Sequence, residues 1–102
     1  MYMRVFIIRF PTKAKAKLIR SFIQTMEKPF QEKSNIISFS VMDIGEGKIL
    51  NVAKYNSKQD FEDTNKWLSP IFLEAIDALD GRVESIPGEV LMHYENKKLE
   101  LY

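Results

Sequence analysis

The chain has 102 residues, of which 45% are hydrophobic, enough for one globular domain with a modest core. Lysine and arginine total 15 against 14 aspartates and glutamates, so the near-neutral chain has no general attraction for nucleic acid or anionic lipid. The absence of cysteine excludes disulfides and thiolate chemistry, and no apolar run approaches the ~20 residues of a membrane span. We therefore expect a cytoplasmic protein that binds neither nucleic acid nor membranes.

Residues 3–10 are dense in β-branched and aromatic side chains and end at Pro11, which predicts a strand. Its apolar residues alternate onto both faces, with Phe6, Ile8 and Phe10 on one and Val5 and Ile7 on the other. The segment carries Arg4 and Arg9, and a lysine-rich helix follows in place of a small-residue cleavage site. It is therefore interpreted as a buried strand and not as a signal peptide.

A first helix is predicted from Thr12, whose side chain can cap it. Its apolar positions recur every three or four residues, at Leu18, Ile19, Phe22, Ile23, Met26 and Phe30. Pro29 lacks a backbone donor, so we expect the helix to kink or end near Lys28.

Two further strands are predicted over residues 36–43 and 48–55. Gly45 and Gly47 permit the positive φ angles of a tight reversal between them, which indicates a hairpin. In the first arm Ile37, Phe39 and Val41 alternate with Ser38, Ser40 and Met42, and in the second Leu50 and Val52 alternate with Ile49, Asn51, Ala53 and Tyr55.

A second helix should begin near Ser57, which is followed three residues later by Asp60 in a pattern close to a capping box. Pro70 has no backbone donor and disfavours helical geometry at Ser69. Because proline suits the first turn of a new helix, we predict that this second helix is broken at Ser69-Pro70, with Ser69 capping its second half. The restarted helix should end at Gly81.

A last strand is predicted after Pro87-Gly88, over residues 89–94. Residues 96–102 are charged but finish with leucines and a tyrosine, so we expect a tail that packs on the domain or on a partner. No internal repeat or linker is present, which predicts a single domain over residues 1–95 followed by this tail.

The predicted order is β-α-β-β-α-β. With right-handed crossovers it gives a ferredoxin-like α+β fold, in which a four-stranded antiparallel sheet has its first and third strands at the centre and helices on one face. The central strands are apolar on both faces. If one face stayed in water, each exposed side chain would forfeit about 1.5 to 3 kcal/mol of burial free energy, and the sum over several side chains would be comparable to the whole stability of a small domain. We therefore predict a homodimer in which the open sheet faces of two copies form a barrel-like core.

The layout resembles the dimeric α+β barrel proteins, and among them the antibiotic-biosynthesis-monooxygenase-like domains. The resemblance extends from MRVFIIRF to GEVLMHYE, with its best local matches at NVAKYNS, QDFED and SPIF. It implies the dimeric fold and several possible activities, among them oxidation of aromatic compounds by molecular oxygen without metal or flavin. Haem cleavage is not expected, because the asparagine and histidine of the haem-degrading branch are replaced by Ile8 or Arg9 and by Ile76.

Polar residues on the central strands are the first candidates for a site. Asn51 and Arg9 each need a partner or a ligand if buried, since an unsatisfied polar group costs a few kcal/mol. Asn51 could instead bond to water or across the strands, and Arg9 could reach solvent or an acidic residue. Ala53 beside Asn51 leaves room for a ligand, and Tyr55 adds a hydroxyl to the rim.

Aromatic residues and the single histidine complete the predicted site. Trp67 and Phe72 would form the walls of a pocket between the sheet and the broken helix, although Trp67 could equally fill the gap at the break. His93 is a reserve general base, with a structural place in the last strand as the alternative. One histidine and scattered carboxylates cannot supply a metal site, so no metal is expected.

Two functional hypotheses follow. The first is a cofactor-independent monooxygenase-like enzyme acting on a small apolar or aromatic substrate, with Asn51 and Arg9 polarising substrate oxygens. The alternative is a non-catalytic homodimeric module that binds a small ligand or only assembles. A closed cavity of about 300 Å³ or more with Asn51 on its wall would favour the enzyme, and a filled core around Trp67 would favour the module.

Overall fold

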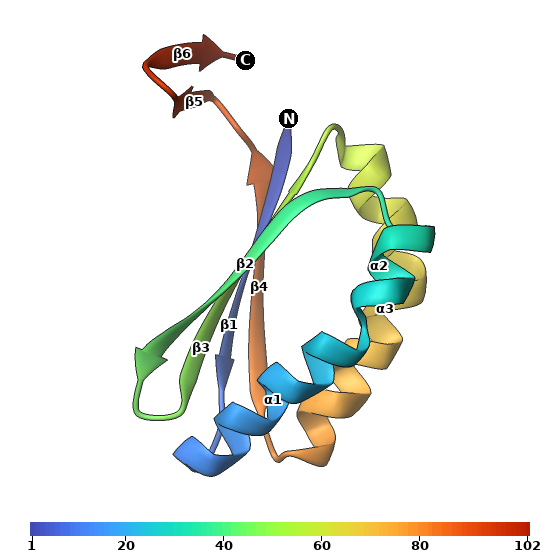
Figure 1. The fold of residues 1–102 in the computed structure, drawn as a ribbon, viewed down its shortest axis with the longest axis vertical. Helices are drawn as coiled ribbons and strands as arrows, with labels where there is room; N and C mark the ends of the chain where they lie inside the picture. The colour runs from blue at the N-terminus through green and yellow to red at the C-terminus, as the bar shows by residue number, and fades with distance from the viewer.

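The computed structural model describes all 102 residues and contains one main sheet with three helices on one of its faces (Figure 1). The sheet is antiparallel, with strand order β2-β3-β1-β4. Its strands are β1 (Tyr2–Arg9), β2 (Ile36–Gly45), β3 (Lys48–Tyr55) and β4 (Arg82–Glu89), and the helices are α1 (Lys13–Thr25), α2 (Glu27–Lys33) and α3 (Lys58–Ala78). The predicted ferredoxin-like α+β fold, with the first and third strands central, is confirmed.

The core lies between the helices and the two central strands. The register places Phe6 opposite Asn51 and Ile8 opposite Ile49, all facing the helices. The main buried cluster is made of Phe6, Ile8, Phe10, Ala16, Ile19, Ile23, Ile49, Phe72 and Ile76. A smaller cluster of Tyr2, Ala53 and Tyr55 continues the core, and Phe61 of α3 packs against it.

Both predicted helix starts are confirmed by their caps. The Thr12 side chain accepts a hydrogen bond of 3.2 Å from the backbone N–H of Lys15. The Ser57 side chain accepts one of 3.1 Å from the backbone N–H of Asp60. None of the helices is both long enough and apolar enough to cross a membrane.

The first helical segment is divided at Met26, before Pro29 itself. In a continuous helix the ring of Pro29 would collide with the carbonyl of Thr25 and leave it without a hydrogen bond. A new helix that begins at Glu27 places Pro29 in its first turn, where no backbone donor is needed. The predicted interruption is confirmed, with the break at Met26 and not near Lys28.

The second predicted break, at Ser69-Pro70, is wrong. Helix α3 continues past Pro70 to Ala78, and its buried residues are Thr64, Leu68, Phe72 and Ile76. These residues are spaced by four positions, so they stay on one face only if the helix continues through the proline. Packing of this stripe on the sheet outweighs the hydrogen bond that Pro70 cannot make.

The predicted turn between β2 and β3 is confirmed at Glu46-Gly47, where both residues have positive φ. This conformation matches the twist of a two-residue hairpin. Gly47 is also required by close packing, because a Cβ there would lie 2.7 Å from the carbonyl oxygen of Phe10.

The last strand of the sheet differs from the prediction. We expected it after Pro87-Gly88 over residues 89–94, whereas β4 contains Pro87 and ends at Glu89. Proline is tolerated there because β4 is an edge strand, with a hydrogen-bonding neighbour on one side only.

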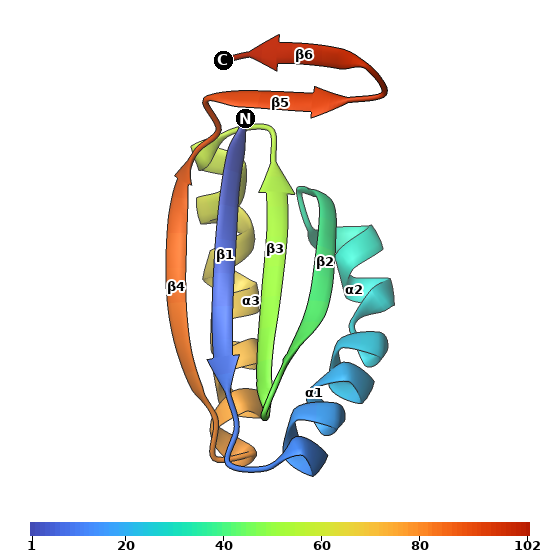
Figure 2. The same ribbon diagram turned by 90° about the vertical axis from the view of Figure 1, so that its left-hand side faces the viewer.

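The residues beyond β4 form a separate C-terminal hairpin of β5 (Met92–Glu95) and β6 (Lys98–Leu101). Its turn uses Asn96 and Lys97, with φ angles of 50° and 66°. The tail expected from residue 96 is therefore the second arm of a hairpin that begins within the predicted domain. Figure 2 shows this hairpin lying across one end of the sheet.

The face of the sheet turned away from the helices is not covered by any other element (Figure 2). Val5, Ile7, Leu50 and Val52 lie half-buried on this open face. The C-terminal hairpin leans toward the same side (Figure 1). The open face is therefore apolar at its centre, as the sequence predicted.

Candidate functional site

A small pocket lies between β1, β2, β3 and the helices, and it is called the enclosed pocket below because most of its lining residues are buried. It has a volume of about 20 Å³ and is lined by Arg4, Phe6, Ile23, Phe30, Ile36, Phe39, Asn51, Ala53, Leu68 and Phe72. Arg4 and Asn51 are the only polar residues in this wall. In this conformation the pocket has room for little more than one water molecule.

Arg4 brings a buried charge into this pocket. The residue is 4% exposed, and its Nη2 donates a hydrogen bond of 3.0 Å to Asn51 Oδ1. Its guanidinium carbon lies 3.4 Å from the centroid of the Phe6 ring. The Nε–H has no hydrogen-bond partner, and no carboxylate forms an ion pair with Arg4. Within the protein, the cation is thus stabilised by an amide oxygen and the face of an aromatic ring.

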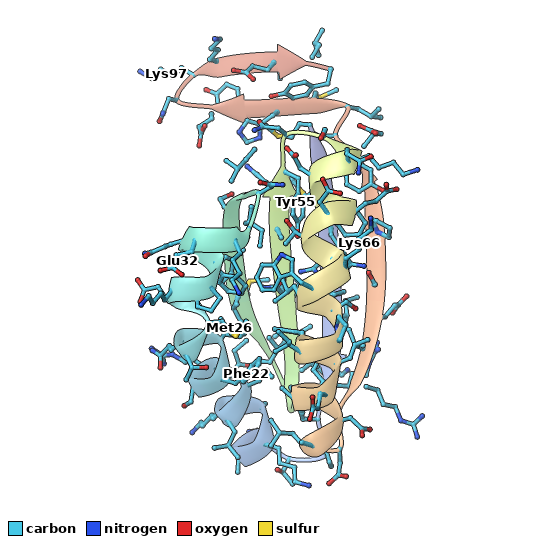
Figure 3. The ribbon with its side chains drawn as sticks, turned by 90° about the vertical axis from the view of Figure 1, so that its right-hand side faces the viewer. Phe22, Met26, Glu32, Tyr55, Lys66 and Lys97 are labelled. Carbon is cyan, nitrogen blue, oxygen red and sulfur yellow. The ribbon has the colours of Figure 1, made fainter.

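Tyr55 supplies a second unpartnered group next to Arg4. Arg4 pairs with Ala53 in the sheet, so Asn51 and Tyr55 are its diagonal neighbours on β3. Tyr55 is fully buried, and its hydroxyl has no hydrogen-bond partner. Figure 3 shows Tyr55 beside the N-terminal turns of α3.

Burial shifts the pKa of both groups. Desolvation lowers the pKa of Arg4 to about 10, although interaction with Tyr55 opposes the shift. Burial raises the pKa of Tyr55, and the positive Arg4 offsets part of that rise. At neutral pH Arg4 is therefore a cation and Tyr55 a neutral hydroxyl, and both can donate a hydrogen bond.

The structure brings together four of the residues that the sequence singled out. Asn51, Ala53 and Phe72 line the enclosed pocket, and Tyr55 is buried beside Ala53. Of the alternatives left open for Asn51, a cross-strand hydrogen bond is observed, because its partner Arg4 belongs to the adjacent strand.

Arg9 lies outside the pocket because of its position on β1. Residues of a strand alternate between faces, so Arg9 points away from the face of Phe6 and Ile8. Its side chain is 52% exposed, and its Nη1 lies 3.9 Å from Glu84 Oε2. Arg9 therefore does not line this pocket, and the arginine in its wall is Arg4. Its even-numbered position, shared with Phe6 and Ile8, was the signal available in the sequence.

His93 and Trp67 also lie outside the enclosed pocket. His93 is on β5, where its Nε2 is 3.6 Å from Glu95 Oε2, and the hairpin that carries it is separate from the main sheet. It therefore does not line this pocket. Trp67 is half-buried on α3. The wall position that we predicted for Trp67 is occupied by its neighbour Leu68. Because α3 has no break, there is also no gap for Trp67 to fill.

An open groove of about 460 Å³ adjoins the enclosed pocket. It is formed by α1, α2 and β2 and is lined by Arg20, Ile23, Gln24, Glu27, Phe30, Gln31, Phe39 and Val41. Ile23, Phe30 and Phe39 line both spaces. The ring centroids of Phe30 and Phe39 are 5.1 Å apart with an interplanar angle of 68°, so this pair forms a partition between groove and pocket.

The closed cavity beside Asn51 that was expected for an enzyme is therefore not observed. Asn51 borders only the enclosed 20 Å³, far less than the roughly 300 Å³ set as the criterion. Space of sufficient size lies directly beyond the Phe30–Phe39 partition, but it is open to solvent.

No protein-family model matches the chain, and no curated protein matches it. Several solved structures do. A "putative antibiotic biosynthesis monooxygenase" from Deinococcus radiodurans is 11% identical, with a TM-score of 0.74 over 88% of this chain and 92% of that one. A dimeric ferredoxin-like protein from an uncultured marine organism is 12% identical, with a TM-score of 0.73 over 94% of this chain and 100% of that one.

A protein from Nitrosomonas europaea with the same description as the first is 9% identical, with a TM-score of 0.69 over 89% of this chain and 99% of that one. The chain thus shares the ferredoxin-like α+β fold of these structures. Identities this low establish the fold and transfer no residue roles.

Proposed function

We propose that the protein is a cofactor-independent monooxygenase-like enzyme that acts on a small apolar or aromatic molecule held between the sheet and the helices. The observation that supports this most is the buried Arg4–Asn51 pair in an otherwise apolar wall. Burying a cation without a carboxylate is costly, and such arrangements cluster at functional sites. The fold shared with structures described as antibiotic biosynthesis monooxygenases adds support.

In the proposed reaction the substrate itself supplies the electrons. A phenol-type ring, once deprotonated, reduces molecular oxygen, and an activated ring CH₂ becomes a ring carbonyl: one oxygen atom of O₂ ends in the C=O group and the other leaves as H₂O with the two hydrogens. Arg4 would stabilise the oxygen on which negative charge develops. Asn51 Oδ1 already accepts a hydrogen bond from Arg4, so the amide NH₂ of Asn51 is the group left to donate to the substrate.

We further propose that two copies form a homodimer through the open sheet face. The C-terminal hairpin on that side, and Leu91 just before it, expose large apolar side chains, with exposed fractions of 74% for Leu91, 64% for Tyr94 and 74% for Leu101. A second copy placed on the open face covers both the sheet and the hairpin. The protein of the same fold that is described as dimeric supports this assembly.

Oxygen uptake tests the enzymatic proposal. Purified protein is mixed with a panel of naphthol-type and anthrone-type compounds in an oxygen electrode. We expect uptake by the wild type and a kcat/KM at least about tenfold lower for Asn51→Ala, because that variant removes a donor to the developing charge. Asn56→Ala changes an exposed asparagine outside the pocket and should behave as the wild type.

The alternative is a non-catalytic homodimeric module that binds a small ligand or only assembles. The small volume of the enclosed pocket, about 20 Å³, favours this alternative. Sedimentation velocity combined with oxygen uptake separates the two. A dimer of two 11.9 kDa chains without uptake for any compound identifies the module, and a monomer contradicts the proposed assembly in both cases.

A further inference from the structure

The enclosed pocket contains a positive charge that nothing else in the chain balances. Arg4 is 4% exposed, its one acceptor is the neutral Asn51 amide, and its Nε–H is unpartnered. The carboxylates that form ion pairs do so with other residues. The fully buried hydroxyl of the neighbouring Tyr55 is unpartnered as well.

We infer that the pocket recognises an anionic oxygen: the ligand is a flat aromatic molecule whose carboxylate or phenolate is held by Arg4. An anion supplies the missing counter-charge and accepts a hydrogen bond from the Arg4 Nε–H. A neutral ligand supplies no such charge. This inference rests on the proposed function, because it names the substrate class for the same site.

A purely structural role for Arg4 does not explain its surroundings. The contact with the Phe6 ring and the single hydrogen bond to Asn51 stabilise the charge less than full burial destabilises it. Methionine at this position would pack among the apolar neighbours without that cost. The charge at Arg4 is thus unfavourable in the empty protein and becomes favourable when an anion binds.

The open groove fits the aromatic part of such a ligand. It offers about 460 Å³ beside Phe30, Phe39 and Val41, whereas the enclosed pocket offers about 20 Å³. The ring therefore lies in the groove, and only the charged group passes the Phe30–Phe39 partition to reach Arg4. Phe30 belongs to α2, a helix with no buried residue, so displacing the partition disturbs little of the core.

Matched aromatic probes test the inference without any need for turnover. Binding of 1-naphthoate, 1-naphthol and 1-naphthalenemethanol to the wild type is measured by isothermal titration calorimetry. The first is a carboxylate, the second gives a phenolate at alkaline pH, and the third is a neutral molecule of similar shape. We expect the anions to bind at least about tenfold more tightly than the neutral probe.

Variants assign this preference to Arg4. Arg4→Met should weaken naphthoate binding by about tenfold or more and leave the affinity for the neutral probe unchanged. Arg9→Met is the matched control, since it removes an exposed arginine from the same strand, and it should bind as the wild type. Because Arg4→Met leaves Asn51 Oδ1 without its donor, the double variant Arg4→Met/Asn51→Leu is measured too, and circular dichroism verifies that each variant is folded.

Equal affinity of the wild type for naphthoate and the neutral probe overturns the inference, as does undiminished naphthoate binding in a folded Arg4 variant. Failure of all three probes to bind also overturns it. Tighter binding of naphthoate than of ionised naphthol identifies the carboxylate, and the reverse identifies the phenolate.

Oxygen uptake is scored separately from binding. Binding of anions that depends on Arg4 without uptake removes the enzymatic proposal and leaves the inference standing. Oxygen uptake together with equal binding of charged and neutral probes removes the inference and leaves the enzymatic proposal standing.

Discussion

The part of the sheet covered by α3 and the part along β2 are packed differently. Under α3, Ile8 is fully buried, and the rings of Phe6 and Phe72 stack with centroids 5.8 Å apart. Along β2, Phe39 and Val41 face the helices but remain 37% and 39% exposed. Figure 2 shows the reason, since α3 lies behind β1, β3 and β4 whereas α1 and α2 stand beside β2.

This difference separates the tightly packed part of the candidate site, under α3, from the part along β2 that borders the open groove. The part of the sheet under α3, called the solid region below, contains Arg4 and Asn51 on the two central strands. In the part along β2, called the open region below, Phe30 and Phe39 lie between those residues and the groove. A binding site needs both a precise framework and a route for its ligand.

The largest expected effect is a cavity in the solid region. Ile8 is 0% exposed, so Ile8→Ala should lower the free energy of unfolding by about 2 to 5 kcal/mol. Val41→Ala in the open region should lower it by less than about 1 kcal/mol. Urea denaturation measures both, and equal losses would show that the two regions are packed alike.

Replacing the proline within α3 should stabilise the protein. Pro70 is exposed inside a continuous helix, so Pro70→Ala should raise the free energy of unfolding by about 2 kcal/mol. Pro29→Ala, in the first turn of α2, should change it by less than about 1 kcal/mol. Thermal unfolding compares the two, and an unchanged Pro70→Ala protein would indicate a helix interrupted at Ser69.

The buried pair should reduce stability in the empty protein. Arg4→Met/Asn51→Leu removes both polar groups, so it should be more stable than the wild type by about 1 kcal/mol. Arg4→Met alone should be less stable than the double variant because Asn51 Oδ1 loses its donor. Urea denaturation at neutral pH measures the series, and a destabilised double variant would mark the pair as structural.

The same pair should make stability depend on pH with a definite sign. Burial lowers the pKa of Arg4 to about 10, so above this pH the folded protein binds fewer protons than the unfolded chain. The cost of burying the charge is complete below pH 10 and fades toward the ordinary pKa of arginine. Wild-type stability should therefore rise relative to Arg4→Met/Asn51→Leu in that window. Urea denaturation of both proteins at several pH values tests this, and a constant difference would contradict it.

The smallest change in stability is expected at the partition. Phe39 is 37% exposed, so Phe39→Ala should cost less than about 1 kcal/mol. It should nevertheless speed the association of 1-naphthoate several-fold, because less side chain must move before the anion reaches Arg4. Stopped-flow tryptophan fluorescence measures this rate. An unchanged rate would mean that the ligand reaches Arg4 by another route.

Strand alternation made much of the site predictable, because each residue of a strand fixes the face of the next. Spacing alone placed Asn51, Ala53 and Tyr55 on one face, and the structure groups them around Arg4. Arg4 itself was missed because arginine is ordinarily exposed, so its inward position was not given weight. The helix-facing side of each strand depended on contacts between distant segments, which the sequence does not contain.

Local rules failed where tertiary packing or an unmarked turn decided the outcome. Pro70 signals a break, but the stripe from Thr64 to Ile76 holds α3 together. The C-terminal hairpin turns at Asn96 and Lys97, where no glycine marks the reversal, and its strands are too short for a clear period.

Helix α2 is a short separate segment, because the chain is interrupted at Met26 between α1 and α2. This helix has seven residues, no side-chain cap hydrogen bond at its start, and Ser34 as its C-cap. Local opening of so lightly anchored a segment requires far less free energy than unfolding of the domain. Because Phe30 lies on α2, we expect opening of this one short helix, and not motion of the central strands, to set how long a bound molecule stays in the site.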